Sequence, residues 1–120
     1  MRRYGQPILV GILLLVFVVG GYIYSTHPTG NNVKTKRIDV TVTAGETMSP
    51  RTWTANQNDS IVINITSDMD GEVHLHGYDI KFQVSKGLPY TKTIVADITG
   101  DFPIEWEETS TPLGDLKVSP

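Results

Sequence analysis

The chain has 120 residues, with 10 Lys or Arg against 13 Asp or Glu, and it contains no cysteine. Its formal net charge of −3 lacks the basic footprint of a nucleic-acid-binding protein, so we expect no nucleic-acid partner. The absence of cysteine excludes disulfides from the fold and thiolates from any metal site. The length leaves room for one small domain in addition to a separate N-terminal segment.

Residues 7–24 predict a membrane anchor, because they form an apolar run without a charged side chain. A helix of this length spans about 27 Å, close to the roughly 30 Å thickness of the hydrocarbon layer. A cleavable signal peptide begins in the same way. However, no small-x-small cleavage site stands out after the run, and Tyr22 and Tyr24 are typical of a membrane interface. We therefore favour an uncleaved signal anchor over a cleaved signal peptide.

The basic residues indicate how this anchor is oriented. Arg2 and Arg3 lie in the stub of residues 1–6 ahead of the span, and the next cation is Lys34, well beyond it. The positive-inside rule keeps such a stub in the cytoplasm and exports the C-terminal side of the span. We expect a single-pass protein of the cell membrane whose C-terminal domain is extracytoplasmic, in the periplasm or outside the cell.

Residues 25–36 are rich in Pro, Gly and Asn without apolar periodicity, which predicts a flexible tether. From residue 37 to residue 120 the pattern is β throughout. It begins with Ile38, Val40 and Val42, which alternate with polar residues as in a half-buried strand.

The remaining strands of this domain are short and are separated by turn signals. About eight strands without a convincing helix are typical of an all-β sandwich or small barrel. We interpret Gly45 to Pro50 as a turn. Besides the strand that holds His74 and His76, we expect strands at 51–55, 60–66, 80–84, 91–97, 102–106 and 113–118.

His74 and His76 are the strongest candidates for a functional site. Side chains alternate along a strand, so histidines at i and i+2 project from one face. In an unbroken strand they would share the core-facing side of Ile80, whereas a bulge or turn at Gly77 would change the register and turn them outward. Two unpaired buried imidazoles would be costly. We therefore favour the outward orientation, with the neighbouring apolar residues facing inward.

The octapeptide Glu72–Asp79 reads Glu-Val-His-Leu-His-Gly-Tyr-Asp. It resembles the His-x-His-Gly-Tyr-Asp signature of small cupredoxin-like domains of exported bacterial proteins, often called EfeO-type. The similarity covers roughly residues 37–120 and includes residues 59–63, 96–105 and 113–120. It implies a Greek-key β-sandwich with a metal site at one end, and it alone favours copper as the metal.

The chain also departs from that family in two respects. Relatives often carry a further histidine just after the Phe-x-x-Glu stretch, where this chain has Glu107. Blue-copper members need a cysteine, a histidine and usually a methionine in the last long loop, and residues 98–113 contain none of these. A type 1 copper centre requires a cysteine and two histidines. This chain therefore cannot form one, nor can it form a thiolate-bridged dinuclear copper centre.

We expect His74 and His76 to bind a metal with Glu107 or Met69 as the third ligand. Imidazole with carboxylate suits Cu(II), Ni(II) or Zn(II), and imidazole with thioether suits copper, especially Cu(I). Zinc is an alternative to copper. The competing hypothesis is a module without metal, in which the histidines are structural and the domain binds another envelope protein.

The other polar and aromatic residues give weaker signals. We interpret Trp53 and Trp106 as core or rim residues and Met48 as a gap-filler or loop residue. No nucleophile–base pair appears, so we expect no enzymatic activity. Several acidic residues could form a rim for a hard cation, although solvated strand edges explain them more simply: Asp68, Asp70, Glu72, Glu105, Glu107 and Glu108.

Overall fold

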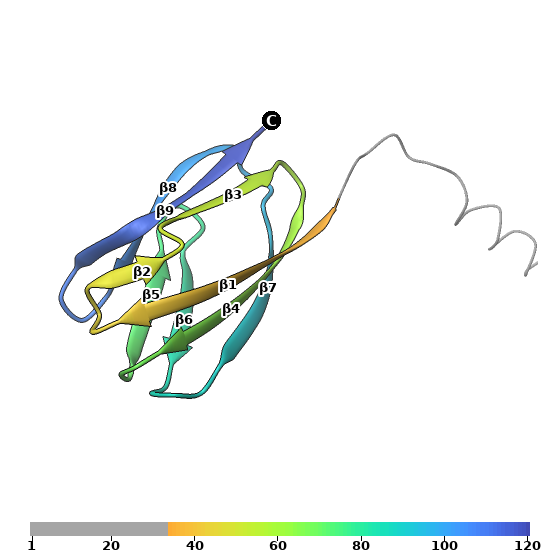
Figure 1. The fold of residues 1–120 in the computed structure, drawn as a ribbon. Helices are drawn as coiled ribbons and strands as arrows, with labels where there is room; N and C mark the ends of the chain where they lie inside the picture. The colour runs from red at the N-terminus through yellow and green to blue at the C-terminus, as the bar shows by residue number, and fades with distance from the viewer. Residues whose placement is uncertain (1–33) are drawn as a thin grey trace, which may run out of the picture. The chain divides into compact units, whose positions relative to one another are not determined.

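The computed structural model describes residues 34–120, which form two β-sheets packed face to face (Figure 1). The predicted stub, the predicted span and most of the predicted tether lie outside the described residues. The nine strands of the described part are β1 (Thr35–Thr43), β2 (Thr47–Ser49), β3 (Thr52–Asn56), β4 (Ser60–Ser67), β5 (Gly71–Leu75), β6 (Ile80–Val84), β7 (Tyr90–Val95), β8 (Gly100–Trp106) and β9 (Thr111–Ser119). Within residues 34–120, no helix is long and apolar enough to cross a membrane.

The strands form a four-stranded sheet in the order β2-β1-β4-β7 and a five-stranded sheet in the order β3-β9-β8-β5-β6. β1 runs parallel to β4, and β3 runs parallel to β9. Parallel neighbours cannot be joined by a tight hairpin, so the chain crosses repeatedly between the sheets. This arrangement confirms the predicted all-β sandwich.

The start of the domain differs in two details from the prediction. β1 begins at Thr35, so the last residues of the predicted tether belong to the sheet. The segment interpreted as a turn contains β2, in which Met48 pairs with Val42 and is buried. A strand of three residues with one apolar side chain has no visible period, which explains why the sequence pattern did not reveal it.

The core lies between the two sheets and follows the alternation of each strand. Ile61, Ile63 and Ile65 of β4 are fully buried and face Trp53 and other residues of the opposite sheet within one apolar cluster. Because Trp53 and Trp106 are both buried in this cluster, their interpretation as core residues is confirmed.

Trp106, at the end of β8, is packed against two glycines. A Cβ at Gly45 would lie 2.7 Å from the indole nitrogen, and a Cβ at Gly71 would overlap the ring. Gly45 also has a φ of 62°, a conformation that glycine adopts without strain. The close fit fixes the end of β8 against the start of β5, the two strands that carry the candidate site.

Candidate metal centre

β5 turns its two histidines outward, as the sequence analysis favoured. Val73 and Leu75 are fully buried, whereas the side chains of His74 and His76 retain 13% and 39% of their exposure. The register changes after His76, where Gly77 has a φ of 83°. β6 therefore resumes with its own apolar residues facing inward, and the predicted outward orientation is confirmed.

Tyr78 holds the turn after the histidines. Its hydroxyl donates a hydrogen bond to the carbonyl oxygen of Ile98 (2.7 Å) and accepts one from the backbone N–H of Ile98 (3.0 Å). Its ring packs edge-to-face on Phe102, with centroids 4.9 Å apart. Burial raises the pKa of the Tyr78 hydroxyl, so the group is a neutral anchor at physiological pH. These contacts tie the turn after His76 to the segment that enters β8.

β8 brings two carboxylates beside the histidines. Its apolar residues Ile104 and Trp106 face the core, so Glu105 and Glu107 project from the same outward face as the imidazoles. β5 and β8 pair antiparallel with His74 directly opposite Glu105. Side chains that face each other across such a pair lie close enough to interact.

The first group of potential ligands, which we call the outer triad, consists of His74, His76 and Glu105. One ligand atom from each residue lies within 4.8 Å of the other two. Nε2 of His76 is 2.8 Å from Oε1 of Glu105, and the centroids of the two imidazole rings are 4.2 Å apart. Two nitrogens and one oxygen thus converge at a partly exposed position.

The second group, which we call the inner triad, consists of Glu72, His74 and Glu107. Its ligand atoms also lie within 4.8 Å of one another. Nδ1 of His74 is 3.4 Å from Oε1 of Glu107, but the two atoms are not aligned for a hydrogen bond. Nε2 of His74 lies 3.2 Å from Oδ1 of Asp79. The two nitrogens of this ring therefore face different carboxylates.

The structure places His76 and Glu107 each in a group with His74, but not both in the same group. Glu107 lies beside His74, as expected, although it belongs to the inner triad and His76 belongs to the outer one. Met69 lies in the exposed loop between β4 and β5, where its backbone exchanges hydrogen bonds with the hydroxyl of Ser67. The role of Met69 as a ligand stays a prediction.

We named Glu72 and Glu105 only as possible members of an acidic rim, and not as ligands beside the histidines. The signal was present, because Glu72, His74 and His76 alternate along β5 and the residue that follows it, just as Glu105 and Glu107 alternate along the end of β8 and the residue that follows it. The pairing of these two strands was not visible in the sequence. The resemblance also implied a metal site at one end of the sandwich, and this location stays a prediction.

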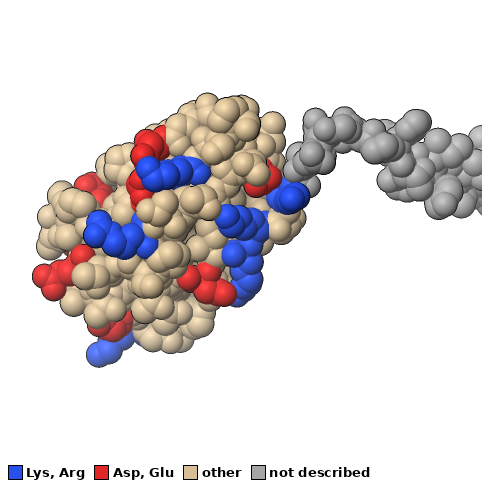
Figure 2. All heavy atoms as spheres, turned by 45° about the horizontal axis from the view of Figure 1, so that its top comes forward, with Lys and Arg blue, Asp and Glu red and all other residues tan. Residues whose placement is uncertain are grey.

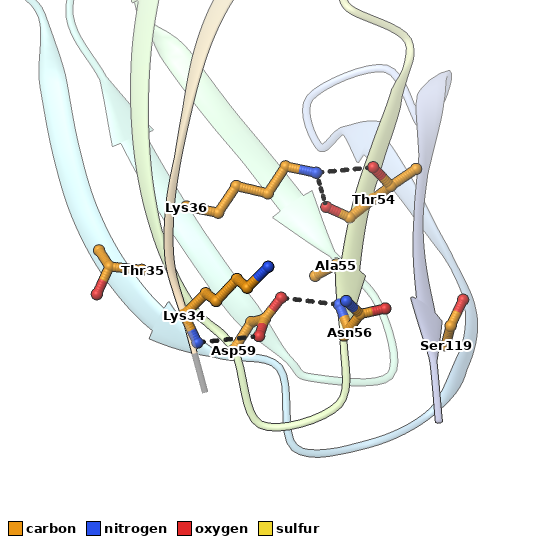
Figure 3. A pocket seen from close by; sticks show the side chains of 8 residues that line it. All are labelled: Lys34, Thr35, Lys36, Thr54, Ala55, Asn56, Asp59 and Ser119. Carbon is orange, nitrogen blue, oxygen red and sulfur yellow. Dashed lines mark hydrogen bonds between the residues drawn. The ribbon is translucent and has the colours of Figure 1, made fainter. Parts of the chain in front are cut away.

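A separate hollow of about 360 Å³ lies between β1 and β3, and it holds no histidine (Figure 3). Lys36 reaches across it and donates hydrogen bonds to the carbonyl oxygen of Thr54 (2.6 Å) and to its hydroxyl (2.8 Å). The buried carboxylate of Asp59 accepts hydrogen bonds from the backbone N–H groups of Asn56 (2.9 Å) and Lys34 (3.3 Å). The hydrogen-bonding groups that line the hollow are paired with one another. We therefore interpret the hollow as a place where side chains connect the edges of two strands.

The charges on the surface are mixed. Figure 2 shows Lys and Arg side chains interspersed with Asp and Glu side chains over the face turned to the viewer. One charged cluster of the described surface joins Lys117 to Asp101 (2.8 Å) and Asp115 (3.3 Å). Hydrogen bonding to Asp101 lowers the pKa of Asp115, and the same two carboxylates raise the pKa of Lys117. Such exposed pairs contribute little to stability.

Comparison with known proteins identifies the fold. No family model matches the chain, and no curated protein matches it. Similar solved structures include a copper binding protein in the apo form (TM-score 0.60, 16% identity, covering 77% of this chain and 93% of that chain). Another is the metal binding domain of the Cu(I) exporting P-type ATPase CopA of Streptococcus pneumoniae D39 (TM-score 0.61, 12% identity, 73% and 95%).

A third similar structure is a chain of a heme-copper terminal oxidase dimer (TM-score 0.59, 14% identity, covering 98% of this chain and 99% of that chain). At these identities the similarity establishes the fold and nothing more. The domain is a cupredoxin-like β-sandwich, as the resemblance implied. The more specific EfeO-type resemblance stays a prediction.

Proposed function

We propose that this chain is a copper-binding, cupredoxin-like protein that holds the metal through His74, His76 and Glu105. The observation that carries the proposal is the convergence of one ligand atom from each of these residues within 4.8 Å on the outward face of the sheet. An imidazole on β5, a second one directly after that strand and a carboxylate on the neighbouring β8 form a pre-organised half of a coordination sphere. The remaining positions would be filled by water or by a ligand from a partner.

The donor set favours Cu(II) over the other candidates. Imidazole and carboxylate suit Cu(II), Zn(II) and Ni(II), and divalent copper binds most tightly in this series. Zn(II) in a structural site is enclosed by four protein ligands, whereas the outer triad supplies three and is partly exposed. Cu(I) prefers soft thioether or thiolate ligands, and the three residues of the outer triad offer imidazole and carboxylate. Copper-binding proteins among the similar structures also support this choice.

We propose that the site carries or delivers copper and does not catalyse a reaction. A partly exposed position lets an ion enter and leave. The uncharged run of residues 7–24 supports the further proposal that the protein is a single-pass membrane protein with an extracytoplasmic domain. In that compartment a copper-loaded surface site would face other envelope proteins.

Metal titration of the full chain, purified in a mild detergent, tests this proposal. We expect Cu(II) to bind stoichiometrically without the intense visible absorption of a copper–thiolate bond. The double variant His74→Ala/His76→Ala should lose this binding. A matched double variant on the outward face of the other sheet, Asn64→Ala/Thr91→Ala, should retain it. Stoichiometric binding that survives loss of both histidines would refute the ligand assignment.

A second candidate function is a metal-free interaction module of a membrane assembly. One observation favours it: the match to a chain of a heme-copper terminal oxidase dimer covers 98% of this chain. In that case His74 and His76 would be structural, each held by a neighbouring carboxylate. Absence of binding by both Cu(II) and Zn(II) in the titration would favour this function.

A further inference from the structure

We infer that Glu72, His74 and Glu107 form a second position for a divalent cation, deeper than the outer triad and sharing His74 with it. The inference rests on the proposed function in one respect, because His74 serves both positions. It adds a site with a different donor set, one imidazole nitrogen and two carboxylates. Such a set suits Zn(II) better than Cu(I).

Two buried polar atoms point to this position. Oε2 of Glu72 and Nδ1 of His74 are both shielded from solvent, and neither has a hydrogen-bond partner within the described residues. Glu72 as a whole is only 8% exposed. A buried carboxylate without compensation is costly. A cation at the inner triad would supply that compensation, because both orphaned atoms lie on residues of this triad.

The surroundings of Glu72 hold its carboxylate in place for this role. Nε2 of Gln83 donates a hydrogen bond to Oε1 (2.7 Å), which leaves Oε2 as the free oxygen. The backbone N–H of Glu107 donates to the carbonyl oxygen of Glu72 (2.9 Å), which fixes the second carboxylate beside the first. Partners of this kind orient metal ligands, and their loss typically costs 10- to 100-fold in affinity.

His74 is a member of both triads, and its two nitrogens face different groups. Nδ1 faces Glu107 of the inner triad, whereas Nε2 lies on the side of Asp79. A ring that binds a cation at each nitrogen does so as the imidazolate, after its proton has passed to solvent. Three carboxylates in the two triads offset the charge of the two cations in part, and Asp79 adds a fourth.

Counting bound Zn(II) in the purified full chain, by native mass spectrometry and calorimetry, tests the inference. We expect two equivalents in the unmodified chain and one in Glu72→Gln. We expect one in His76→Ala, which leaves the inner triad intact. Gln83→Leu should weaken Zn(II) binding only at the inner triad, by about 10- to 100-fold. Glu46→Gln, in the exposed β1–β2 turn, is the matched control and should retain two.

The outcomes separate this inference from the proposed function. If the unmodified chain binds a single Zn(II) that is lost in His76→Ala and retained in Glu72→Gln, the inner position is overturned and the outer triad stands. If the unmodified chain binds a single Zn(II) that is retained in His76→Ala and lost in Glu72→Gln, the inner position is supported and the outer ligand set is overturned. No Zn(II) or Cu(II) binding at all would overturn both. Circular dichroism of each variant verifies that the fold is intact.

Discussion

The outward faces of the two sheets are both polar, yet they are built differently. On the four-stranded sheet, Arg37 and Asp39 pair at 3.1 Å with 57% and 68% of their side chains exposed. Asn64 accepts a hydrogen bond from Thr91 at 2.7 Å. On the five-stranded sheet, the side chain of His74 keeps only 13% of its exposure and lies among carboxylates that do not satisfy both of its nitrogens.

The difference in exposure and pairing distinguishes a solvated surface from a candidate binding site. Exposed groups that pair with each other have water as an alternative partner, so their pairing changes the free energy of unfolding little. Nδ1 of His74 and Oε2 of Glu72 have lost that alternative, and a bound cation would supply the missing partner. The alternation of polar residues is the same on both faces. The proposed metal binding therefore depends on the burial and convergence of the polar groups and not on their number.

The largest effect is expected from the core beneath the site. Trp106→Ala would leave a large cavity between Gly45 and Gly71 and lower the free energy of unfolding by about 3–5 kcal/mol. Urea denaturation followed by circular dichroism measures the loss. Val95→Ala, at an exposed position of the four-stranded sheet, is the control and should cost less than about 1 kcal/mol. Equal losses would show that Trp106 does not support the site.

The next effect concerns metal affinity and compares one carboxylate from each face. Glu105→Gln replaces the carboxylate ligand of the outer triad with a neutral amide and should weaken Cu(II) binding by about 10- to 100-fold, or roughly 1.4–2.7 kcal/mol. Asp39→Asn, on the other face, should leave the affinity unchanged. Calorimetric titration provides the affinity. An equal loss in both variants would mean that only general negative charge attracts the metal.

A smaller effect is expected for the metal-free protein. Glu72→Gln removes a buried charge and keeps an acceptor for Gln83, so the free energy of unfolding should rise by about 1 kcal/mol. Chemical denaturation in the presence of a chelator measures it. A gain in stability together with a loss of metal is expected of a functional site. Destabilisation by more than about 1 kcal/mol would assign Glu72 a purely structural role.

The smallest effect is expected on the solvated face. Arg37→Ala breaks the exposed pair with Asp39 and should change the free energy of unfolding by no more than about 0.5 kcal/mol. Raising the salt concentration should reduce even this difference, because exposed charges are screened. A loss above about 1 kcal/mol would indicate that the two faces are less different than proposed.

Much of the fold could be predicted from the sequence, because alternation determines which side of each strand is buried. Ile61, Ile63 and Ile65 are a clear example. The orientation of His74 and His76 depended on Gly77, whose positive φ changes the register. Glu72 and Glu105 were visible as polar residues on predicted strands. Their roles depended on which strands pair, and strand pairing is a long-range property that local periodicity does not contain.

The electron paramagnetic resonance spectrum of the Cu(II)-loaded full chain tests the central claim most directly. The account predicts the spectrum of a normal, non-blue copper site, with magnetic coupling to two imidazole nitrogens. That coupling should fall to one nitrogen in His76→Ala. A spectrum without imidazole coupling, or one that His74→Ala and His76→Ala both leave unchanged, would contradict copper binding by this pair.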